Sequence, residues 1–199
     1  MRKLDLAGFL LLLQHPKTFT FGRRDSSEHL LSSKDDLVAQ GFELVQTDRG
    51  GLVTYHGPGQ LVGYPILNLE KLNIRGAHEY VGKLERVLTS TLADFEVQAS
   101  LYEGLRGVFV DQNKIAAIGV HLKKQVSRHG FALNVEPDLD HYRHITPCGL
   151  SAYGVTSLAE LGAEVSMSEV VQSLSRHFNA IFEVQTEAIE LEKFIEKEK

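Results

Sequence analysis

The sequence predicts a mixed α/β (α+β) fold in which a largely antiparallel sheet packs against helices. Short strand-like runs alternate irregularly with runs of helical periodicity, and no fixed period recurs that would indicate a repeat protein. The four residues 111–114 lie between two strand-like runs and fit a hairpin turn, which favours antiparallel pairing. No linker rich in Pro, Gly or Ser divides the chain, so we expect one domain over residues 1–199.

The first elements alternate between strand and short helix. The run Phe9–Leu13 is continuously apolar, which predicts a strand buried on both faces. Asp25 and Ser33 are each followed three residues later by an acidic residue, which is the pattern of a capping box and predicts two short helices. The second helix should end near Gly41, and a strand is expected over residues 42–47.

The middle of the chain carries the clearest periodic signals. A short strand is expected over residues 64–67, and apolar residues at helical spacing predict a long amphipathic helix over residues 77–92. Three strands are expected next, over residues 107–110, 115–122 and 130–135. The long helix should therefore pack on a sheet that these strands form.

Two further helices are predicted near the C-terminus. Ser157 and Ser166 are each followed three residues later by a glutamate, and the second pair precedes an apolar stripe at helical spacing. The highly charged residues 187–199 are expected to form a solvated helix.

Composition limits the classes of function. The 199 residues are 43% hydrophobic and 24% charged, with a formal net charge of −5. This balance gives no general footprint for nucleic acid or for an anionic membrane, and the apolar run near the N-terminus is too short to span a bilayer. A single cysteine excludes an intrachain disulfide and fits a reducing compartment, so we expect a cytoplasmic protein.

The single cysteine is the first candidate for chemistry. Cys148 lies between Pro147, which restricts the backbone, and Gly149, which frees it. Such a bend suits a nucleophile, because an acyl group can approach the sulfur and nearby backbone N–H groups can meet the developing negative charge. On these residues alone, a small buried thiol is the alternative.

A glycine-rich segment over residues 48–60 is the second candidate. Its glycines at positions 50, 51, 57 and 59 allow the backbone to approach a ligand closely. It lacks the Gly-Lys-Ser/Thr ending of a phosphate-binding P-loop and the spacing of a dinucleotide fingerprint. From composition alone, a tight turn and a ligand-binding loop remain equally compatible with it.

Four short motifs occur in order along the chain. They are Arg-Gly-Gly-x-x-Thr-Tyr-His-Gly-Pro-Gly-Gln at 49–60, Lys-Ile-Ala-Ala-Ile-Gly at 114–119, His-Gly-Phe-Ala-Leu-Asn at 129–134 and Pro-Cys-Gly-Leu at 147–150. Together they closely resemble the octanoyltransferases of lipoate biosynthesis, which move octanoyl from acyl carrier protein to lipoyl domains. The similarity extends over about residues 8 to 160. One motif alone would be weak, but four in order are specific.

The resemblance implies an acyltransferase on the scaffold of the biotin and lipoate protein ligase catalytic domains. It implies that Cys148 carries the acyl group as a thioester, and that Lys114 lowers the pKa of the thiol and shuttles protons. No cofactor and no metal ion are implied. The implied substrate-binding residues are Arg49, Gly50, Gly51, Leu52, Val53, Thr54, Tyr55, His56, Ala117, Ile118, Gly119, Gly130, Phe131 and Ala132.

The implied partners are octanoyl-acyl carrier protein, the lipoyl domains of 2-oxoacid dehydrogenase complexes and the glycine cleavage H protein. Neither nucleic acid nor a membrane is implied. Members usually carry a further strand and helix before the segment equivalent to Phe9. Either the start site is set too late or the scaffold has been shortened, and this bears on the cover over one sheet edge rather than on the chemistry.

Other functions remain open at this level. An ATP-dependent lipoate-protein ligase could use the same scaffold, although it has no need of a thiol nucleophile. A Cys–His hydrolase or amidase would use His141 or His144, which closely precede Cys148. A non-enzymatic acyl- or lipoyl-domain-binding module would need the pocket without the Lys–Cys pair. The nine histidines include no His-Glu-x-x-His pattern, so a zinc site is not predicted.

Overall fold

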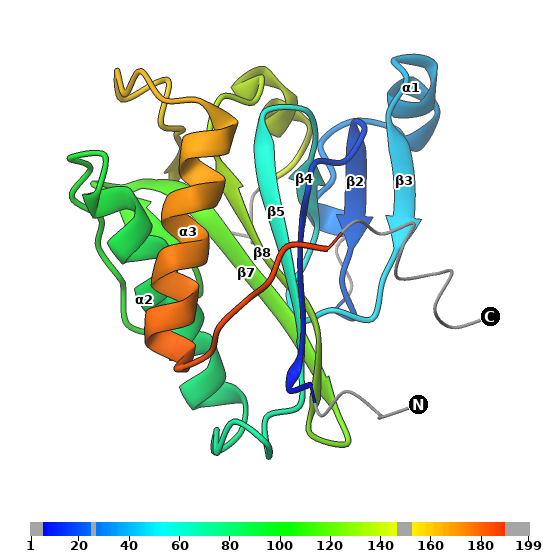
Figure 1. The fold of residues 1–199 in the computed structure, drawn as a ribbon. Coiled ribbons are helices and arrows are strands. Elements are labelled where there is room, and N and C mark those ends of the chain that lie inside the picture. The colour runs from blue at the N-terminus through cyan, green and yellow to red at the C-terminus, as the bar shows by residue number, and fades with distance from the viewer. Residues whose placement is uncertain (1–5, 25–26, 147–152, 190–199) are drawn as a thin grey trace.

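The structure is a computed structural model that describes residues 6–24, 27–146 and 153–189; Cys148 lies outside these ranges. Two sheets make up its framework (Figure 1). The large sheet has six strands, and five of them follow the order β1-β5-β8-β7-β6 while β9 pairs with β7. The strands are β1 (Gly8–Leu13), β5 (Gln60–Leu67), β6 (Val108–Val110), β7 (Asn113–Lys123), β8 (Val126–Asn134) and β9 (Gly154–Val155).

Pairing in the large sheet is antiparallel except between β7 and β9. The predicted mixed fold with a largely antiparallel sheet is therefore confirmed. Strands β7 and β8 form a hairpin whose two turn residues, Lys124 and Gln125, both have positive φ (50° and 61°). This backbone geometry matches the twist of the flanking strands.

The small sheet has the order β3-β2-β4. Its strands β2 (Thr18–Phe21) and β3 (Glu43–Gln46) are parallel, and β4 (Thr54–His56) runs antiparallel to β2. The connection from β2 to β3 passes through the 3₁₀ turn η1 (Ser27–His29) and the helix α1 (Lys34–Ala39).

The two short helices expected in this connection have different outcomes. The Ser33 side chain accepts a hydrogen bond from the Asp36 backbone N–H at 3.1 Å, and the chain leaves the helical region at Gly41 with φ +82°. The predicted second helix is confirmed as α1. The first is wrong as a helix, because the described residues there form only the single turn η1.

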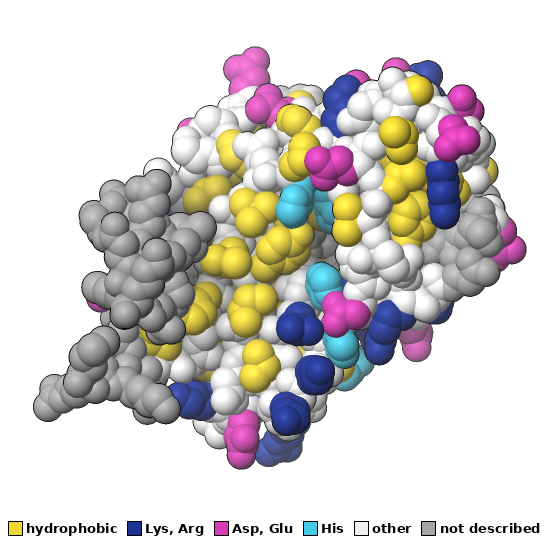
Figure 2. Space-filling view, turned by 90° about the vertical axis from the view of Figure 1, so that its right-hand side faces the viewer, with side chains coloured by type: hydrophobic (Ala, Val, Ile, Leu, Met, Phe, Trp, Pro, Cys, Tyr) yellow, Lys and Arg dark blue, Asp and Glu magenta, His cyan; other side chains and the backbone are white. Residues whose placement is uncertain are grey.

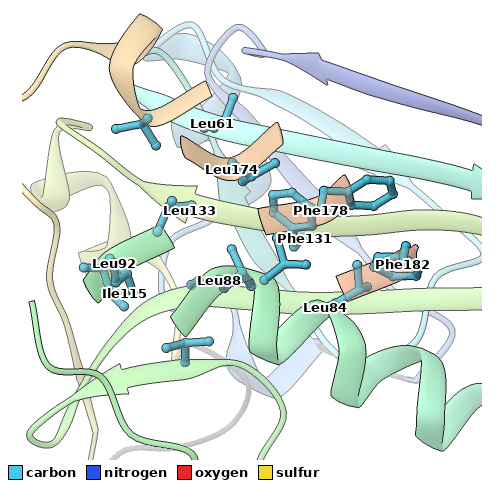
Figure 3. Close-up of a cluster of buried hydrophobic side chains, with 14 of the residues drawn as sticks. Leu61, Leu84, Leu88, Leu92, Ile115, Phe131, Leu133, Leu174, Phe178 and Phe182 are labelled. Carbon is cyan, nitrogen blue, oxygen red and sulfur yellow. The ribbon is translucent and has the colours of Figure 1, made fainter. Parts of the chain in front are cut away.

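Helices α2 (Ala77–Ala93) and α3 (Met167–Phe182) lie side by side on one face of the large sheet (Figure 1). Both were predicted, and α3 begins with the expected capping box between Ser166 and Glu169. Their apolar stripes meet the sheet in the main core, where Leu84, Leu88 and Phe178 are at most 1% exposed (Figure 3). In the described part of the chain, no helix is long and apolar enough to cross a membrane.

Three local expectations need correction. Strand β1 is at the edge of the large sheet and Leu11 is 42% exposed, so it is not buried on both faces. Residues 158–162, where a helix beginning at Ser157 was predicted, form turns instead, because the backbone N–H of Leu158 continues the sheet by bonding Asn134 O and Gly162 turns the chain at φ +80°. Residues 187–189 are not helical, and residues 190–199 lie outside the described ranges.

Candidate functional site

Four small residues form a floor on the face of the large sheet that α2 and α3 do not cover. In the pairing of β7 with β8, Ala117 faces Ala132 and Gly119 faces Gly130. Their neighbours Phe131 and Leu133 belong to the main core beneath the helices. Because side chains alternate between the two faces of a strand, Ala117, Gly119 and Ala132 face away from the helices. Gly130 completes the floor with its backbone, since a Cβ atom there would lie 2.1 Å from Gly63 O of the neighbouring strand.

A β-bulge brings Lys114 to this same face. The register between β6 and β7 shifts, so that Val108 pairs with Ala116 whereas the next residue, Phe109, pairs with Lys114. Ile115 is the extra residue, and both Ile115 and Ala116 pack into the main core. The bulge thus breaks the strict alternation, and Lys114 lies on the open face with the floor.

Lys114 is buried, with 6% of its surface exposed. Its Nζ donates a hydrogen bond to the backbone O of Arg106 at 3.2 Å and lies 5.1 Å from the centre of the Phe109 ring. A buried ammonium group is costly unless polar or aromatic partners replace its water. Its burial and these two contacts distinguish Lys114 from an ordinary surface lysine.

The segment that holds Cys148 begins and ends at anchored positions. Before it, the Thr146 backbone N–H bonds His29 O at 2.9 Å. After it, the Tyr153 ring lies 5.5 Å from the Phe109 ring, and the Thr156 backbone N–H bonds Lys114 O at 3.0 Å. The residues that follow this segment therefore lie beside Lys114. Cys148 itself is outside the described residues.

The glycine loop, residues 49–51, is packed tightly over the floor. Its Gly50 N–H bonds the Val120 backbone O at 3.1 Å. A Cβ atom on Gly119 would lie 3.1 Å from Gly50 O, and one on Gly22 would lie 2.2 Å from Gly51 O. The loop thus reaches the large sheet on one side and Gly22 on the other. A side chain at Gly22 would collide with the loop, and one at Gly119 would make an unusually tight contact with it.

Arg49 ties the glycine loop to the small sheet. Its Nη2 donates to Thr20 O at 2.6 Å and to Thr20 Oγ1 at 2.9 Å, and its Nη1 donates to Gly50 O at 3.0 Å. Only 8% of its surface is exposed. Arg49 is therefore a buried part of the loop's framework rather than a surface charge.

A buried polar network lies beside the floor. The His56 ring is 2.8 Å from Gln60 Oε1, and Gln60 Nε2 donates to Asn134 Oδ1 and to Tyr142 Oη, each at 2.9 Å. Asn134 Nδ2 donates in turn to Thr156 O, next to the backbone of Lys114. We did not select Gln60, Asn134 and Tyr142 from the sequence, although Gln60 and Asn134 each end one of the four motifs.

Burial lowers the pKa of His56 to about 4 from its ordinary value near 6.5. The unfolded chain therefore binds more protons between these two values, so stability should fall as the pH falls from about 6.5 to about 4. A shift of this size corresponds to roughly 3 kcal/mol. We expect His56→Gln, which does not titrate, to flatten this dependence in urea unfolding measured from pH 4 to 8. Parallel wild-type and variant curves would contradict the assignment.

The other predicted pocket residues lie in three places: near the glycine loop, in a smaller core, and in the main core. Gly51, within the glycine loop, and Leu52 and Thr54, which follow it, are half-buried. Val53 and Tyr55 are 1% exposed and belong to a second, smaller core between the small sheet and the turn η2 (Leu139–His144). Ile118 and Phe131 point to the helix face, where Phe131 is 3% exposed in the main core (Figure 3).

The histidines near Cys148 in sequence already have partners. His141 Nδ1 lies 2.8 Å from Tyr55 Oη and its Nε2 lies 3.3 Å from Asp138, while His144 Nδ1 lies 2.7 Å from Ser32 Oγ. Figure 2 shows histidine side chains beside a band of hydrophobic side chains on the surface. Among the residues that the structure describes, no group of three or more His, Cys, Asp or Glu could hold a metal ion.

Comparison with known proteins identifies the family. The model of the lipoyl protein ligase A/B catalytic domain matches residues 2–179. An octanoyltransferase of Solibacter usitatus is 49% identical over 90% of this chain and 80% of its own, and one of Clostridium kluyveri is 43% identical over 90% and 76%.

Solved structures show the same fold at lower identity. A lipoate-protein ligase A bound with ATP has a TM-score of 0.76 at 17% identity, over 95% of this chain and 79% of that chain. Protein Ta0514 of T. acidophilum with bound lipoic acid has a TM-score of 0.73 at 16% identity, over the same shares. The chain belongs to the lipoyl protein ligase A/B catalytic domain family, and within it to the octanoyltransferases.

Proposed function

We propose that this acyltransferase moves octanoyl from an acyl carrier protein to a lysine of a lipoyl domain through a thioester on Cys148. The observation that carries the proposal is the position of Lys114. It is a buried ammonium on the open face of the sheet, and its backbone is bonded to the strand that follows the Cys148 segment. A cation at this place favours the thiolate form of a nearby cysteine.

In the first half-reaction, the Cys148 thiolate attacks the carbonyl carbon of the octanoyl thioester. The C–S bond to the carrier breaks, and the carrier thiolate takes a proton from the Lys114 ammonium. Backbone N–H groups at Cys148 or Gly149 are the proposed donors to the oxyanion that forms. The products are octanoyl-Cys148, free carrier thiol and a neutral Lys114.

In the second half-reaction, the ε-amine of the lipoyl-domain lysine attacks octanoyl-Cys148. Lys114, now neutral, accepts the proton that the attacking amine loses, and the amide forms as Cys148 leaves as a thiolate. This restores the starting protonation of both groups. Because an amide replaces a thioester, the transfer runs downhill, and the proposal needs neither ATP nor a metal ion.

The floor suits the alkyl chain of the acyl group. From Lys114, strand β7 runs to Ala117 and then Gly119, where the glycine loop covers it. Five residues of strand extend over roughly 16 Å, which leaves room for a lysine side chain and a medium-length alkyl chain. Each methylene that leaves water contributes about 0.8 kcal/mol. Leu52 stays a proposed contact of the alkyl chain. Val53, Ile118 and Phe131 belong to the two cores that pack beneath the site and would not touch the chain.

The two histidines that precede Cys148 in sequence are weaker candidates for its base. His141 has both ring nitrogens near other polar groups, and His144 is held by Ser32. These contacts favour Lys114 as the partner of the thiol. A Cys–His hydrolase would also have to admit water to the acyl-enzyme.

Intact-protein mass spectrometry tests the proposal against its alternatives. Incubation with octanoyl-acyl carrier protein should add one octanoyl group to the protein, and subsequent addition of a lipoyl domain should remove it and acylate that domain. A ligase would instead modify the lipoyl domain only from free lipoate with ATP. A binding module would remain unmodified under both conditions, and a hydrolase would release octanoate without acylating the domain.

A further inference from the structure

The carboxylate of Asp48 is held by three side chains of the large sheet. Its Oδ1 accepts a hydrogen bond from His129 Nε2 at 2.5 Å, and its Oδ2 accepts from His121 Nδ1 at 2.8 Å and from Arg128 Nη1 at 3.4 Å. The hydrogen bonds from His129 and His121 keep the pKa of Asp48 below its usual range. Asp48 is therefore an anion at neutral pH, positioned immediately before the glycine loop.

The backbone of His129 adopts an unusual conformation that serves this contact. Its φ is +59°, a region that residues other than glycine rarely occupy. In regular alternation along β8, His129 would share the helix face with Phe131, and Arg128 would point to the open face. The side chains of these two consecutive residues instead both reach Asp48, so the alternation is broken at His129. Such a conformation persists where its surroundings enforce it, and it is a reason to look for function.

The glycine loop is held from two directions. On the side of the small sheet, the Arg49 side chain donates a hydrogen bond to Thr20 O, and the Arg49 backbone O accepts one from the Arg23 N–H at 3.1 Å. On the large sheet, the loop is held by the Gly50 bond to Val120 O and by Asp48. The Asp48 contacts thus join the two sheets at the place where the loop covers the floor.

We propose that Asp48 is a positioning residue for the acyl substrate. The Asp48 clamp, formed by Asp48, His121, Arg128 and His129, keeps the glycine loop down on Gly119 and so sets the width of the acyl site. Releasing the clamp would loosen the cover over the alkyl chain while leaving Lys114, which lies toward the other end of β7, unchanged. The effect on transfer rests on the proposed function, whereas the effect on the loop does not.

Hydrogen exchange tests the clamp independently of any activity. Asp48→Ala removes both imidazole contacts, while Asp48→Asn keeps one carbonyl oxygen and can accept from only one histidine. We expect amide exchange in residues 49–52 to accelerate about tenfold in Asp48→Ala and less in Asp48→Asn. Amides of α2 should keep the wild-type rate, which would show that the fold is intact. Asp140→Asn, which removes a surface carboxylate paired with Arg143 at 2.6 Å, is the matched control.

Steady-state kinetics with a short octanoyl thioester test the consequence. Asp48→Ala should raise KM about tenfold with kcat within about twofold, because binding is loosened and the reacting groups are not. His121→Ala should have a smaller effect of the same kind, and the double variant should equal Asp48→Ala alone, since both act through one contact. Asp140→Asn should match the wild type.

Several results would overturn the clamp. One is unchanged amide exchange of residues 49–52 in Asp48→Ala. A second is a fall in kcat of Asp48→Ala with KM unchanged. A third is that the Asp48→Ala and His121→Ala effects on KM add in the double variant. If the wild type itself forms no octanoyl-enzyme, the proposed function fails, and the exchange data alone then decide whether Asp48 holds the loop.

Discussion

Replacing Cys148 with alanine should reduce octanoyl transfer by about 10⁴-fold or more, because the covalent route has no other nucleophile of comparable strength in the proposed mechanism. Incubation of the wild type with octanoyl-acyl carrier protein should add one octanoyl group, and the Cys148→Ala variant should gain none. Intact-protein mass spectrometry and a lipoyl-domain acylation assay measure the two effects.

Cys148→Ser distinguishes the nucleophile from a merely structural thiol. The serine hydroxyl nearly preserves the size of the side chain but attacks poorly, so the variant should stay unmodified or accumulate a slowly released ester. Circular dichroism should show the same helix content in all three proteins. Wild-type transfer by Cys148→Ala would rule out the thioester route and leave direct transfer between the two substrates.

Replacing Lys114 with alanine should reduce kcat/KM by about 10²- to 10³-fold, since in the proposed mechanism this one group supplies both thiol activation and proton transfer. The pKa of a free cysteine is near 8.5, so only a few per cent is thiolate at neutral pH. Loss of the nearby ammonium should return the thiol toward that value. The rate of Cys148 alkylation by iodoacetamide, measured against pH, reports the change directly.

Two further variants separate the roles of Lys114. Lys114→Arg should preserve much of the alkylation rate and still transfer octanoyl poorly, because a guanidinium barely loses its proton. Lys123→Ala is the matched control, since Lys123 is exposed at the far end of the same strand. An alkylation profile of Lys114→Ala identical to the wild type would exclude Lys114 as the activating group and return attention to His141 and His144.

The sequence predicts the elements whose signals are local. Helices α2 and α3 repeat apolar residues at helical spacing, and the capping box at Ser166 marks where α3 begins. Strands β6, β7 and β8 are close in sequence and pair as neighbours. Strands β2, β4 and β9 have only two to four residues each, so pairing with other strands defines them more than their own composition does.

Turn chemistry accounts for the helix that was wrongly predicted to begin at Ser157. Ser157 has the same spacing to a glutamate as Ser166, and its Oγ does accept a hydrogen bond from the Glu160 N–H at 3.1 Å. That contact caps a turn and not a helix, because the segment stays bonded to the end of the sheet and Gly162 ends it. A local cap signal therefore cannot by itself decide how far a helix continues.

The sequence alone determined the family and the residue types of the candidate site, because four motifs in order carry both. Tertiary structure alone decided which of these residues share a face. The bulge at Ile115 places Lys114 on the open side of the sheet, and strand alternation turns Phe131 into the core while Gly130 and Ala132 form the floor. The partners of Asp48 likewise depend on the left-handed backbone at His129. Alternation, bulges and register arise from pairing between distant segments, and no local pattern in one segment contains them.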